Sequence, residues 1–550
     1  MRFLKGFTPY RKEDRERYRR LGIWMGITFG DLIDRAADIY PRREALVDRE
    51  MRFTYDEVRE RVNRLAIGLI ELGIKKTERV LLQLPNWAEF VFSYFALQKI
   101  GAIPVLLIDR YRQYEISHLL KLTRAKAWIV PETYGKTDYL PIIEDIKSSN
   151  TGLKNVILVR GRRRKDLIGL ESLMERKISA SSLELLEKRR PDPMQVAHMG
   201  PTGGTTGLPK VVPRTHNDYL CRVRYASYAL EMTLNDITLI SAPIGHDLAF
   251  SMGLCTTLFS FGKVVMLDST RAEDIVRTIE KEKVTYTAWT PTFVSRILEF
   301  EGLKNYDLSS LKKMYCGGGA SSEKLIREAF EKLKCVYVNA YGGTEGMKAQ
   351  TRLDDPIEIV TRSVGKKVCP YDIYKVVDEK GNELPPGKAG ELIIKGPCVF
   401  TGYFKSEEEN KKVFTEDGFF RTGDIATIDD DGNITITGRI REMIKRGGES
   451  ISATEIENLI YTHPKVALCA VIGMPDLKMG ERVCAYIKPK EGERITFEEI
   501  ISHLKEKKAS VLQLPERIEF VDSMPLTAAN KIDKRALRED IKKRIGWKDE

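Results

Sequence analysis

A loop rich in glycine and threonine, at residues 203–210, has the composition of a phosphate-binding site. It reads Gly-Gly-Thr-Thr-Gly-Leu-Pro-Lys and follows an apolar stretch at residues 196–199 that predicts a strand. Glycines let backbone N–H groups approach phosphate oxygens, threonine hydroxyls donate further hydrogen bonds, and the Lys210 ammonium adds a positive charge. The loop therefore predicts a polyphosphate site, while the same composition also suits an ordinary flexible loop.

The loop is not a Walker A motif, because that motif places glycine directly before lysine and here Leu208 and Pro209 intervene. It resembles instead the phosphate-binding signature of the adenylate-forming superfamily, which includes acyl-CoA synthetases, aryl-acid ligases, luciferases and the adenylation domains of peptide synthetases. Further blocks follow in the order of that family: Gly317-Gly318-Gly319-Ala320, Tyr341-Gly342-Gly343-Thr344-Glu345, Gly390-Glu391-Leu392, Phe420-Arg421-Thr422-Gly423-Asp424, Gly438-Arg439 and Pro525-Leu526-Thr527-Ala528-Ala529-Asn530-Lys531. The resemblance extends from about residue 54 to residue 538 and implies that ATP activates a carboxylic acid as its acyl-adenylate.

The resemblance implies four catalytic residues. Thr344 would hold the α-phosphate, and Glu345 would bind a Mg²⁺ that bridges phosphate oxygens. Lys531 would join the acid to the α-phosphate, and Lys210 would contact the outer phosphates. Asn530 stands where the family usually has glycine, and asparagine tolerates the left-handed backbone of such a turn. Taken alone, Glu345 could be a surface carboxylate and Lys531 one of several basic residues near the C-terminus.

Other residues would line the nucleotide site. Tyr341 offers an aromatic face to adenine, and Asn339 would bind the adenine amino group. Asp424 and Arg439 would bind the ribose hydroxyls, although a bare Gly-Asp pair is usually a turn. The remaining predicted contacts are phosphate donors and small residues that leave room for the nucleotide: Thr202, Gly203, Gly204, Thr205, Thr206, Gly207, Gly318, Gly319, Ala320, Ala340 and Gly342.

In this family a small C-terminal domain turns after adenylation and presents a second face to the active site. The hinge corresponds to Arg441. The second face would carry Lys445, Gly447 and Gly448, since adjacent glycines suit a narrow tunnel for a pantetheine arm. An ordinary tight turn is the alternative interpretation of these glycines.

The acyl pocket is where the sequence departs from its nearest likeness, the bacterial 2,3-dihydroxybenzoate:AMP ligases. Those enzymes carry His-Asn-Tyr where this chain has His246-Asp247-Leu248, so two polar partners for ring hydroxyls are lost. We expect an apolar acid, either aromatic, alicyclic or short-to-medium aliphatic, and we expect Asp247 to point away or to pair with a cation. The predicted pocket residues are His246, Asp247, Leu248, Phe250, Gly343 and Met347.

The thiol that accepts the acyl group is expected to be that of coenzyme A, since no carrier or condensation domain is recognisable in this chain. Lys445 and Arg446 could bind its phosphates. The phosphopantetheine of a carrier protein ends in the same thiol, so an aryl-acid ligase that loads a carrier is the alternative. A non-catalytic nucleotide or acyl sensor, or a basic scaffold, is a further alternative, against which the full set of catalytic residue types argues.

The elements that must position these residues follow an α/β pattern. Apolar runs at residues 80–84, 102–108, 127–130, 236–241, 263–267, 313–316 and 336–340 predict buried strands and alternate with amphipathic stretches such as 87–100, which indicates layered, mostly parallel sheets. After about residue 363, short strands with Asp-Gly and Pro-Gly turns predict a small antiparallel, barrel-like layer. We expect a large N-terminal domain over 1–438, a hinge at 439–442 and a small, mobile α+β domain over 443–550.

Composition narrows the protein's class and partners. The formal charge of +11 is spread along the chain, and the run Arg162-Arg163-Arg164-Lys165 lacks interleaved aromatics, so we expect a solvated loop and no nucleic-acid partner. No stretch is long and apolar enough for a membrane span, and no signal peptide is recognisable. The eight cysteines and six histidines show no zinc spacing, so we expect reduced, buried thiols and no transition metal. The expected location is the cytoplasm, and the oligomeric state is left open, although a homodimer is common in the family that the chain resembles.

Overall fold

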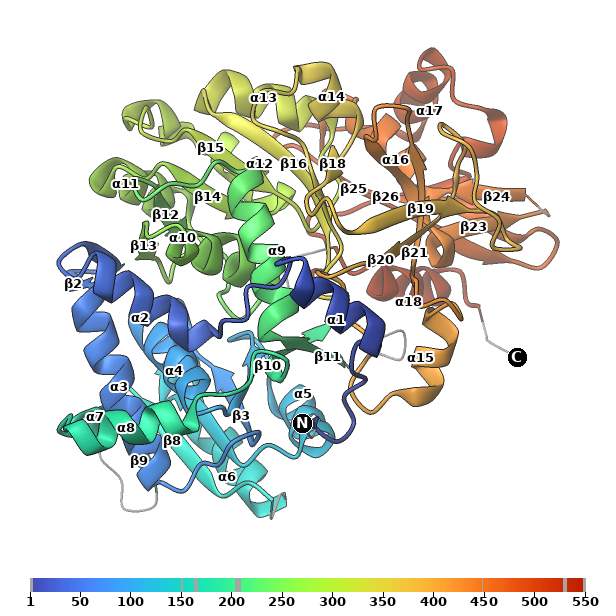
Figure 1. Ribbon diagram of the computed structural model, residues 1–550. Coiled ribbons are helices and arrows are strands. Elements are labelled where there is room, and N and C mark those ends of the chain that lie inside the picture. Colours follow the sequence, from blue (N-terminus) through green and yellow to red (C-terminus); the bar gives the residue numbers. More distant parts are fainter. Residues whose placement is uncertain are drawn as a thin grey trace.

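The computed structural model describes residues 3–149, 152–162, 167–202, 209–447, 449–527 and 532–547. It has a large N-terminal domain built around two mainly parallel sheets and a small C-terminal domain with a sheet of its own (Figure 1). The layered α/β architecture predicted from the alternation of apolar runs and amphipathic stretches is confirmed.

The first sheet has seven strands in the order β11-β10-β4-β3-β5-β8-β9. Only the pairing of β10 with β11 is antiparallel. β3, β4, β5 and β8 are almost wholly buried, as expected for strands whose two faces are both covered by other layers. The strands are β3 (Arg79–Gln83), β4 (Ile103–Leu107), β5 (Ala127–Pro131), β8 (Asn155–Val159), β9 (Ile168–Gly169), β10 (Val196–Thr202) and β11 (Lys210–Thr215).

The second sheet has nine strands in the order β18-β17-β16-β15-β14-β12-β13-β1-β2, with antiparallel pairs only at its two edges. β15 ends directly before Gly317-Gly318-Gly319, and its parallel neighbour β16 runs into Tyr341-Gly342-Gly343, so the carboxyl ends of these two strands bring the glycine blocks together. The strands are β1 (Glu44–Asp48), β2 (Met51–Thr54), β12 (Ile237–Ile240), β13 (Lys263–Met266), β14 (Tyr286–Trp289), β15 (Lys313–Cys316), β16 (Val336–Gly342), β17 (Lys348–Gln350) and β18 (Lys366–Lys367).

Helix α4 (Ala88–Lys99) lies between the two sheets and contacts β1 of one sheet and β3 and β4 of the other. Its sequence is apolar on every side, and all but one of its residues are buried, as expected for a helix with no solvent face. Phe90 and Tyr94 pack against Phe250, while Phe92 packs against Phe53. The two sheets therefore share one continuous core through this helix.

The other helices of the large domain pack on the two sheets and on one another, and several begin at capping boxes. Thr28 caps α2 with Asp31, and Thr54 caps α3 with Glu57. These helices are α1 (Lys12–Arg20), α2 (Phe29–Ile39), α3 (Tyr55–Glu71), α5 (Gln113–Thr123), α6 (Leu140–Ser149), α7 (Leu170–Met174), α8 (Ala180–Arg189), α9 (His216–Ala229), α10 (Thr256–Phe259), α11 (Ala272–Glu282), α12 (Pro291–Leu298), α13 (Glu323–Leu333) and α14 (Ile357–Arg362). A π-helix, Leu248–Cys255, precedes α10.

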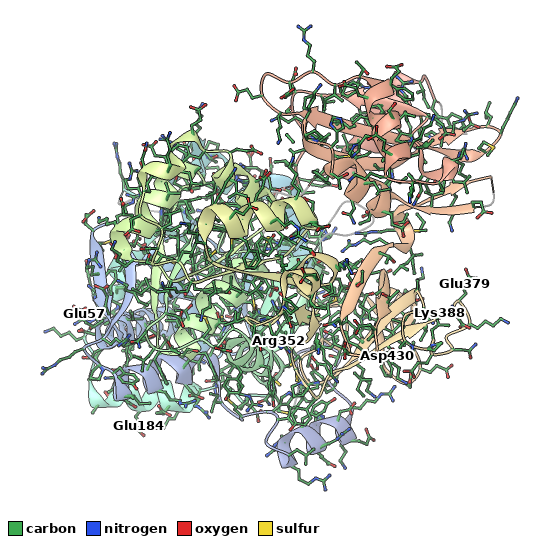
Figure 2. The ribbon with its side chains drawn as sticks, turned by 90° about the horizontal axis from the view of Figure 1, so that it is seen from above. Glu57, Glu184, Arg352, Glu379, Lys388 and Asp430 are labelled. Atoms are coloured by element: carbon green, nitrogen blue, oxygen red, sulfur yellow. The ribbon has the colours of Figure 1, made fainter. Side chains whose placement is uncertain are left out.

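A four-stranded antiparallel sheet, β19-β20-β21-β22, forms the layer predicted after residue 363. Its strands are β19 (Ile373–Val377), β20 (Gly390–Lys395), β21 (Phe420–Ile428) and β22 (Ile434–Arg439), and α15 (Glu407–Val413) lies between β20 and β21 in the chain. Figure 2 labels Glu379, Lys388 and Asp430 on the turns of this sheet, on the side of the molecule away from Glu57 and Glu184.

The small domain follows β22 after a single turn of 3₁₀-helix, Ile440–Glu442, and has its own apolar core. Its sheet has the order β24-β23-β26-β25, with β27 on β26. The elements are β23 (Met443–Arg446), β24 (Glu449–Ser452), α16 (Ala453–Tyr461), β25 (Val466–Asp476), β26 (Gly480–Pro489), α17 (Phe497–Glu506), β27 (Arg517–Phe520) and α18 (Lys534–Arg544). None of the described helices, in either domain, is long and apolar enough to cross a membrane.

Candidate active site

A cavity of about 610 Å³ lies between the large and the small domain. Residues from both domains line it, from Thr290 and Pro291 at the start of α12 to Glu457 of α16 and Lys534 of α18. The cavity brings together nine of the residues predicted for the nucleotide, which are Gly318, Gly319, Ala320, Asn339, Ala340, Tyr341, Gly342, Asp424 and Arg439.

Asp424 forms a polar triad with two other predicted residues at one wall of this cavity. Its Oδ1 lies 2.7 Å from Arg439 Nε, and its Oδ2 accepts a hydrogen bond from the Tyr341 hydroxyl. The paired strands β21 and β22 place Asp424 directly opposite Arg439. Burial and the Asp424 carboxylate both raise the pKa of Tyr341, so this hydroxyl stays protonated and keeps donating.

Asn339 lies in the buried part of β16, and its side-chain amide is fixed by backbone carbonyl oxygens. Its Nδ2 donates to the carbonyl oxygens of Val360 (3.0 Å) and Ser363 (2.9 Å). With both amide hydrogens engaged, Oδ1 is the polar atom of this side chain that remains for a ligand in the cavity.

The loop that carries Thr344 and Glu345 is held from behind by Arg214, which the sequence did not single out. Arg214 is wholly buried, and its Nη1 donates to the Thr344 carbonyl oxygen (2.7 Å) while its Nη2 donates to that of Cys398 (2.6 Å). Its Nε pairs with Asp218 (2.7 Å). The signal that could have identified Arg214 in the sequence is an arginine within the apolar run of β11, because arginine is seldom buried without partners.

The backbone at this loop leaves no space for a larger residue at Gly346. Its φ is +108°, and a Cβ there would lie 2.1 Å from the Cys398 carbonyl oxygen. Gly200 of β10 is similarly tight, because a Cβ there would lie 2.8 Å from Thr344 Cγ2. Thr344 and Glu345 are therefore confined between β10 on one side and the segment around Cys398 on the other.

Tyr403 contacts both Glu345 and Lys210. The Tyr403 hydroxyl donates to Glu345 Oε1 (3.0 Å), and Lys210 Nζ lies 4.8 Å from the centre of the Tyr403 ring. Lys210 itself is paired with Glu409 of α15. No described lysine or arginine forms an ion pair with Glu345. A buried carboxylate without a basic partner fits the predicted role of binding Mg²⁺.

The predicted acyl-pocket residue Asp247 is paired with a cation, which is one of the two arrangements expected from the sequence. Arg222 binds its Oδ2, and the Tyr219 hydroxyl donates to its Oδ1 (2.7 Å). Burial alone would raise the pKa of Asp247, but Arg222 outweighs it and lowers that pKa to about 2. Nearby, Lys348 contacts the Tyr315 hydroxyl and ring, and burial lowers the pKa of Lys348 well below its usual range.

The other predicted pocket residues differ in how exposed they are and in what they pack against. His246 is half-buried just before the π-helix, and its Nδ1 accepts from Leu248 N (3.3 Å). Met347 and Gly343 lie together, since a Cβ on Gly343 would approach Met347 Cε within 2.7 Å. Phe250 has no exposed surface and packs 4.8 Å from the ring centre of Tyr94, so it supports the π-helix rather than lining an open pocket.

The predicted hinge lies between the two domains, and the predicted second face lies in the small domain. Arg441 is exposed on the 3₁₀ turn between the domains. Lys445 and Gly447 lie on the β23–β24 hairpin and do not line the cavity. Instead Lys534 enters it and pairs with Glu442 (3.0 Å) and Glu457 (2.8 Å).

Several predicted residues lie outside the described part of the chain. They are Gly203, Gly204, Thr205, Thr206, Gly207, Gly448 and Lys531. Thr202 and Lys210, at either end of the phosphate loop, are paired across β10 and β11.

Comparisons with known proteins identify the family of this chain. The family model "AMP-binding enzyme" matches residues 33–404, and "AMP-binding enzyme C-terminal domain" matches residues 455–531. The chain is 38% identical to a 2,3-dihydroxybenzoate-AMP ligase of Bacillus subtilis (strain 168), with 98% of this chain and 99% of that one covered. It is 32% identical to a 2-hydroxy-7-methoxy-5-methyl-1-naphthoate–CoA ligase of Streptomyces carzinostaticus, with 97% and 96% covered.

A solved structure of similar fold is that of the anthranilate CoA ligase AuaEII in complex with anthranoyl-AMP. It superposes with a TM-score of 0.86 at 25% identity and covers 95% of this chain and 98% of that one. The matches extend over both domains and over the blocks that form the cavity wall. The chain therefore belongs to the AMP-binding enzyme family and is an adenylate-forming enzyme.

Proposed function

We propose that this enzyme uses ATP to adenylate an aromatic carboxylic acid and then transfers the acyl group to the thiol of a phosphopantetheine carried by a partner protein. The observation that carries the proposal is the interdomain cavity, where Tyr341, Asp424 and Arg439 form one wall. A cavity between the two domains would let the α-phosphorus of a bound nucleotide meet a second substrate.

In the first step, a carboxylate oxygen of the acid attacks the α-phosphorus, the bond to the β-phosphate breaks and pyrophosphate leaves. The enzyme's part is to position the reactants and to compensate the charge on the phosphates. Thr344 would contact the α-phosphate, and Lys531 would bridge it to the acid. Mg²⁺ bound at Glu345 would neutralise phosphate charge. Lys210 would exchange Glu409 for the outer phosphates, together with Thr205 and Thr206 in the loop before it.

The nucleoside would lie along the wall made by β16, β21 and β22. Asp424 would accept from the ribose hydroxyls, with Arg439 holding its orientation. Asn339 would accept from the adenine amino group through Oδ1, because its Nδ2 is engaged by two carbonyl oxygens. The Tyr341 ring would stack on the base.

The acid itself is expected to be aromatic and to lack a catechol. Both oxygens of Asp247 are engaged, by Tyr219 and Arg222, and Leu248 offers no polar atom. A pocket without free polar partners gives ring hydroxyls little reward, whereas it discriminates methylenes by roughly 1–3 kcal/mol each. Relatives named for aryl acids support the aromatic ring, and the departure at Asp247 and Leu248 supports the missing hydroxyls.

The acceptor thiol is assigned to a carrier protein because two of the relatives are named as 2,3-dihydroxybenzoate-AMP ligases, one of Bacillus subtilis and one, vibriobactin-specific, of Vibrio cholerae. The comparisons thus favour this alternative over coenzyme A, which the sequence favoured. Coenzyme A is the second candidate, and relatives named as CoA ligases support it. Either thiol would approach past Lys445, Gly447 and Gly448 after the small domain turns about Arg441.

Acid-dependent exchange of labelled pyrophosphate into ATP tests the first step. The panel comprises benzoate, salicylate, 2,3-dihydroxybenzoate, cyclohexanecarboxylate and hexanoate. Exchange that is fastest with benzoate supports the proposal. A preference for 2,3-dihydroxybenzoate contradicts the assigned acid, and no exchange with any acid contradicts adenylation and favours a sensor.

The second step is tested by supplying the enzyme, ATP and the preferred acid with either coenzyme A or a phosphopantetheinylated aryl carrier protein. Thioester formation is followed by mass spectrometry. A kcat/KM at least tenfold higher with the carrier is expected, and the reverse order assigns the enzyme to coenzyme A.

A further inference from the structure

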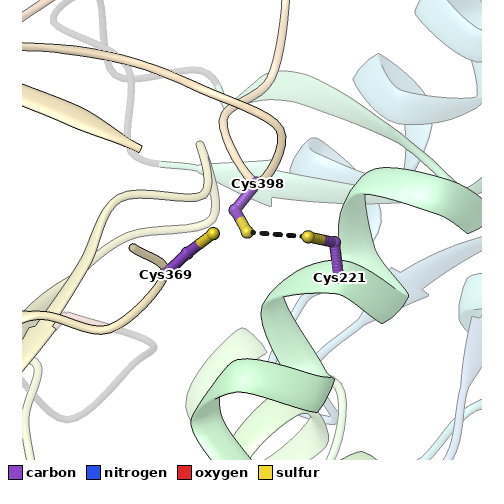
Figure 3. Close-up of side chains that lie close together, drawn as sticks. All are labelled: Cys221, Cys369 and Cys398. Atoms are coloured by element: carbon purple, nitrogen blue, oxygen red, sulfur yellow. Dashed lines mark hydrogen bonds between the residues drawn. The ribbon is translucent and has the colours of Figure 1, made fainter. Parts of the chain in front are cut away.

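Three cysteines that lie far apart in the sequence meet in the buried interior of the large domain. Cys221 lies on α9, Cys369 in the turn before β19 and Cys398 in the loop after β20 (Figure 3). Their sulfur atoms all lie within 4.8 Å of one another, and the Cys221 and Cys398 sulfurs are 3.4 Å apart. A tetrahedral zinc site with Zn–S bonds of about 2.3 Å places its sulfurs roughly 3.8 Å apart. The three thiols are therefore spaced for one ion.

A carboxyl group with one unpartnered oxygen among the described residues lies beside them. Asp372 closes the turn that begins at Cys369, since its N–H donates to the Cys369 carbonyl oxygen (3.2 Å). Its Oδ1 accepts from Cys398 N (3.2 Å), while among the described residues its Oδ2 is buried without a hydrogen-bond partner. Asp372 has no exposed surface.

The nearby basic residues do not neutralise this carboxylate. Lys367 Nζ donates to the backbone oxygens of Pro370 (3.1 Å) and Asp372 (2.9 Å) rather than to the side chain. Arg214 is paired with Asp218. Among the described residues, neither of these basic side chains therefore pairs with the Asp372 carboxyl group, whose Oδ2 remains available to a cation.

We propose that Cys221, Cys369 and Cys398 bind one Zn²⁺ as thiolates, with Asp372 taking the fourth position or hydrogen-bonding the ligand that does. Thiolates select a soft or borderline ion, and four-coordinate sites with no open position are structural. The site is enclosed by Tyr10, Tyr18 and Trp24, which also leaves no path for a substrate.

The ion would fix the position of the segment around Cys398, which confines the loop that carries Thr344 and Glu345. The Cys398 carbonyl oxygen accepts from Arg214, which also holds the Thr344 carbonyl oxygen, and it lies against Gly346. Zinc would thus tie α9, the turn at Cys369 and the loop at Cys398 into one unit behind Thr344 and Glu345. No zinc-ligand spacing is visible in the sequence, because Cys221 and Cys398 are 177 residues apart.

The test measures metal in the full-length enzyme, purified under reducing conditions and loaded with Zn²⁺ or Co²⁺. We expect one zinc per chain by mass spectrometry and, with Co²⁺, the intense absorption of a tetrahedral thiolate site. Cys335→Ser, a buried cysteine outside the cluster, is the matched control and should keep both. Cys369→Ser should lose both, and Asp372→Asn should weaken zinc binding at least tenfold.

Wild-type behaviour decides the matter even if the cysteine variants do not fold. A strong chelator should lower the Tm of wild type and of Cys335→Ser, and added Zn²⁺ should restore it. A wild-type chain that takes up no metal, or one that forms a Cys221–Cys398 disulfide in its place, overturns the proposal. Equal Co²⁺ spectra in wild type and Cys369→Ser also overturn it.

Discussion

Replacing Arg214 by methionine should separate the stability of the large domain from the geometry of the catalytic loop. The change keeps most of the side-chain volume but removes a charge that is wholly buried beside Asp218, itself only 2% exposed. Breaking a buried ion pair from one side leaves an uncompensated charge and costs about 3–5 kcal/mol. The carbonyl oxygens of Thr344 and Cys398 also lose their donors. We expect the free energy of unfolding to fall by that amount and kcat to fall at least tenfold.

The double variant Arg214→Met/Asp218→Asn distinguishes the two effects. With the second charge removed, about 2 kcal/mol of stability should return, because part of the loss comes from the unpaired buried carboxylate. Activity should not return, since Thr344 still lacks the bond that fixes its backbone. Arg327→Met is the matched control, because Arg327 is exposed and its ion pair with Glu323 should contribute less than about 1 kcal/mol.

Urea unfolding followed by fluorescence, and pyrophosphate exchange at saturating ATP, measure the two quantities. The reasoning is refuted if Arg214→Met unfolds within about 1 kcal/mol of wild type. It is also refuted if the double variant regains wild-type exchange rates, because Arg214 would then act only by neutralising Asp218.

Three further predictions concern nucleotide binding and pH. Asp424→Ala should lower kcat/KM for ATP about 100-fold, since hydrogen bonds to a charged group contribute roughly 1.5–3 kcal/mol each, while Asp430→Ala on an exposed turn should change it less than twofold. Glu409→Gln frees Lys210 for phosphate and should lower the KM for ATP about two- to fivefold; a raised KM would contradict the exchange of partners. Burial lowers the pKa of His216 to about 3, so below pH 6.5 the unfolded chain takes up a proton that the folded chain does not, and stability falls. Between pH 7.5 and 5, urea unfolding of wild type should therefore lose about 2 kcal/mol more than that of His216→Gln, and equal losses would contradict the assignment.

The fold and the glycine, tyrosine and aspartate residues that line the interdomain cavity were predictable, because their signals in the sequence are local. Buried parallel strands are continuous apolar runs, so β15 was predicted with its observed ends. The glycine blocks and Asp424 stand in short motifs whose residue types suit a nucleotide. Each of these signals needs only a few neighbouring residues.

The supports of the site were not predictable, because each depends on a partner distant in sequence. Arg214 acquires its role from the carbonyl oxygens of Thr344 and Cys398, and Tyr403 from the Glu345 carboxylate. Phe250 was expected to line the acyl pocket, but the π-helix turns it toward Tyr94. No periodicity in the sequence marks a π-helix, so the direction of that side chain could not be inferred.

The helix α4 has a consequence for how this protein is made. A growing chain that has not yet passed residue 248 contains α4 and the strands β3, β4 and β5, but not the π-helix against which Phe90 and Tyr94 pack. Until then, Phe90 and Tyr94 lack their contacts with Phe250. Exposed apolar surface binds chaperones and drives the aggregation of incomplete chains. The domain is thus expected to reach its native state only after synthesis of the second sheet, in one late step rather than sheet by sheet.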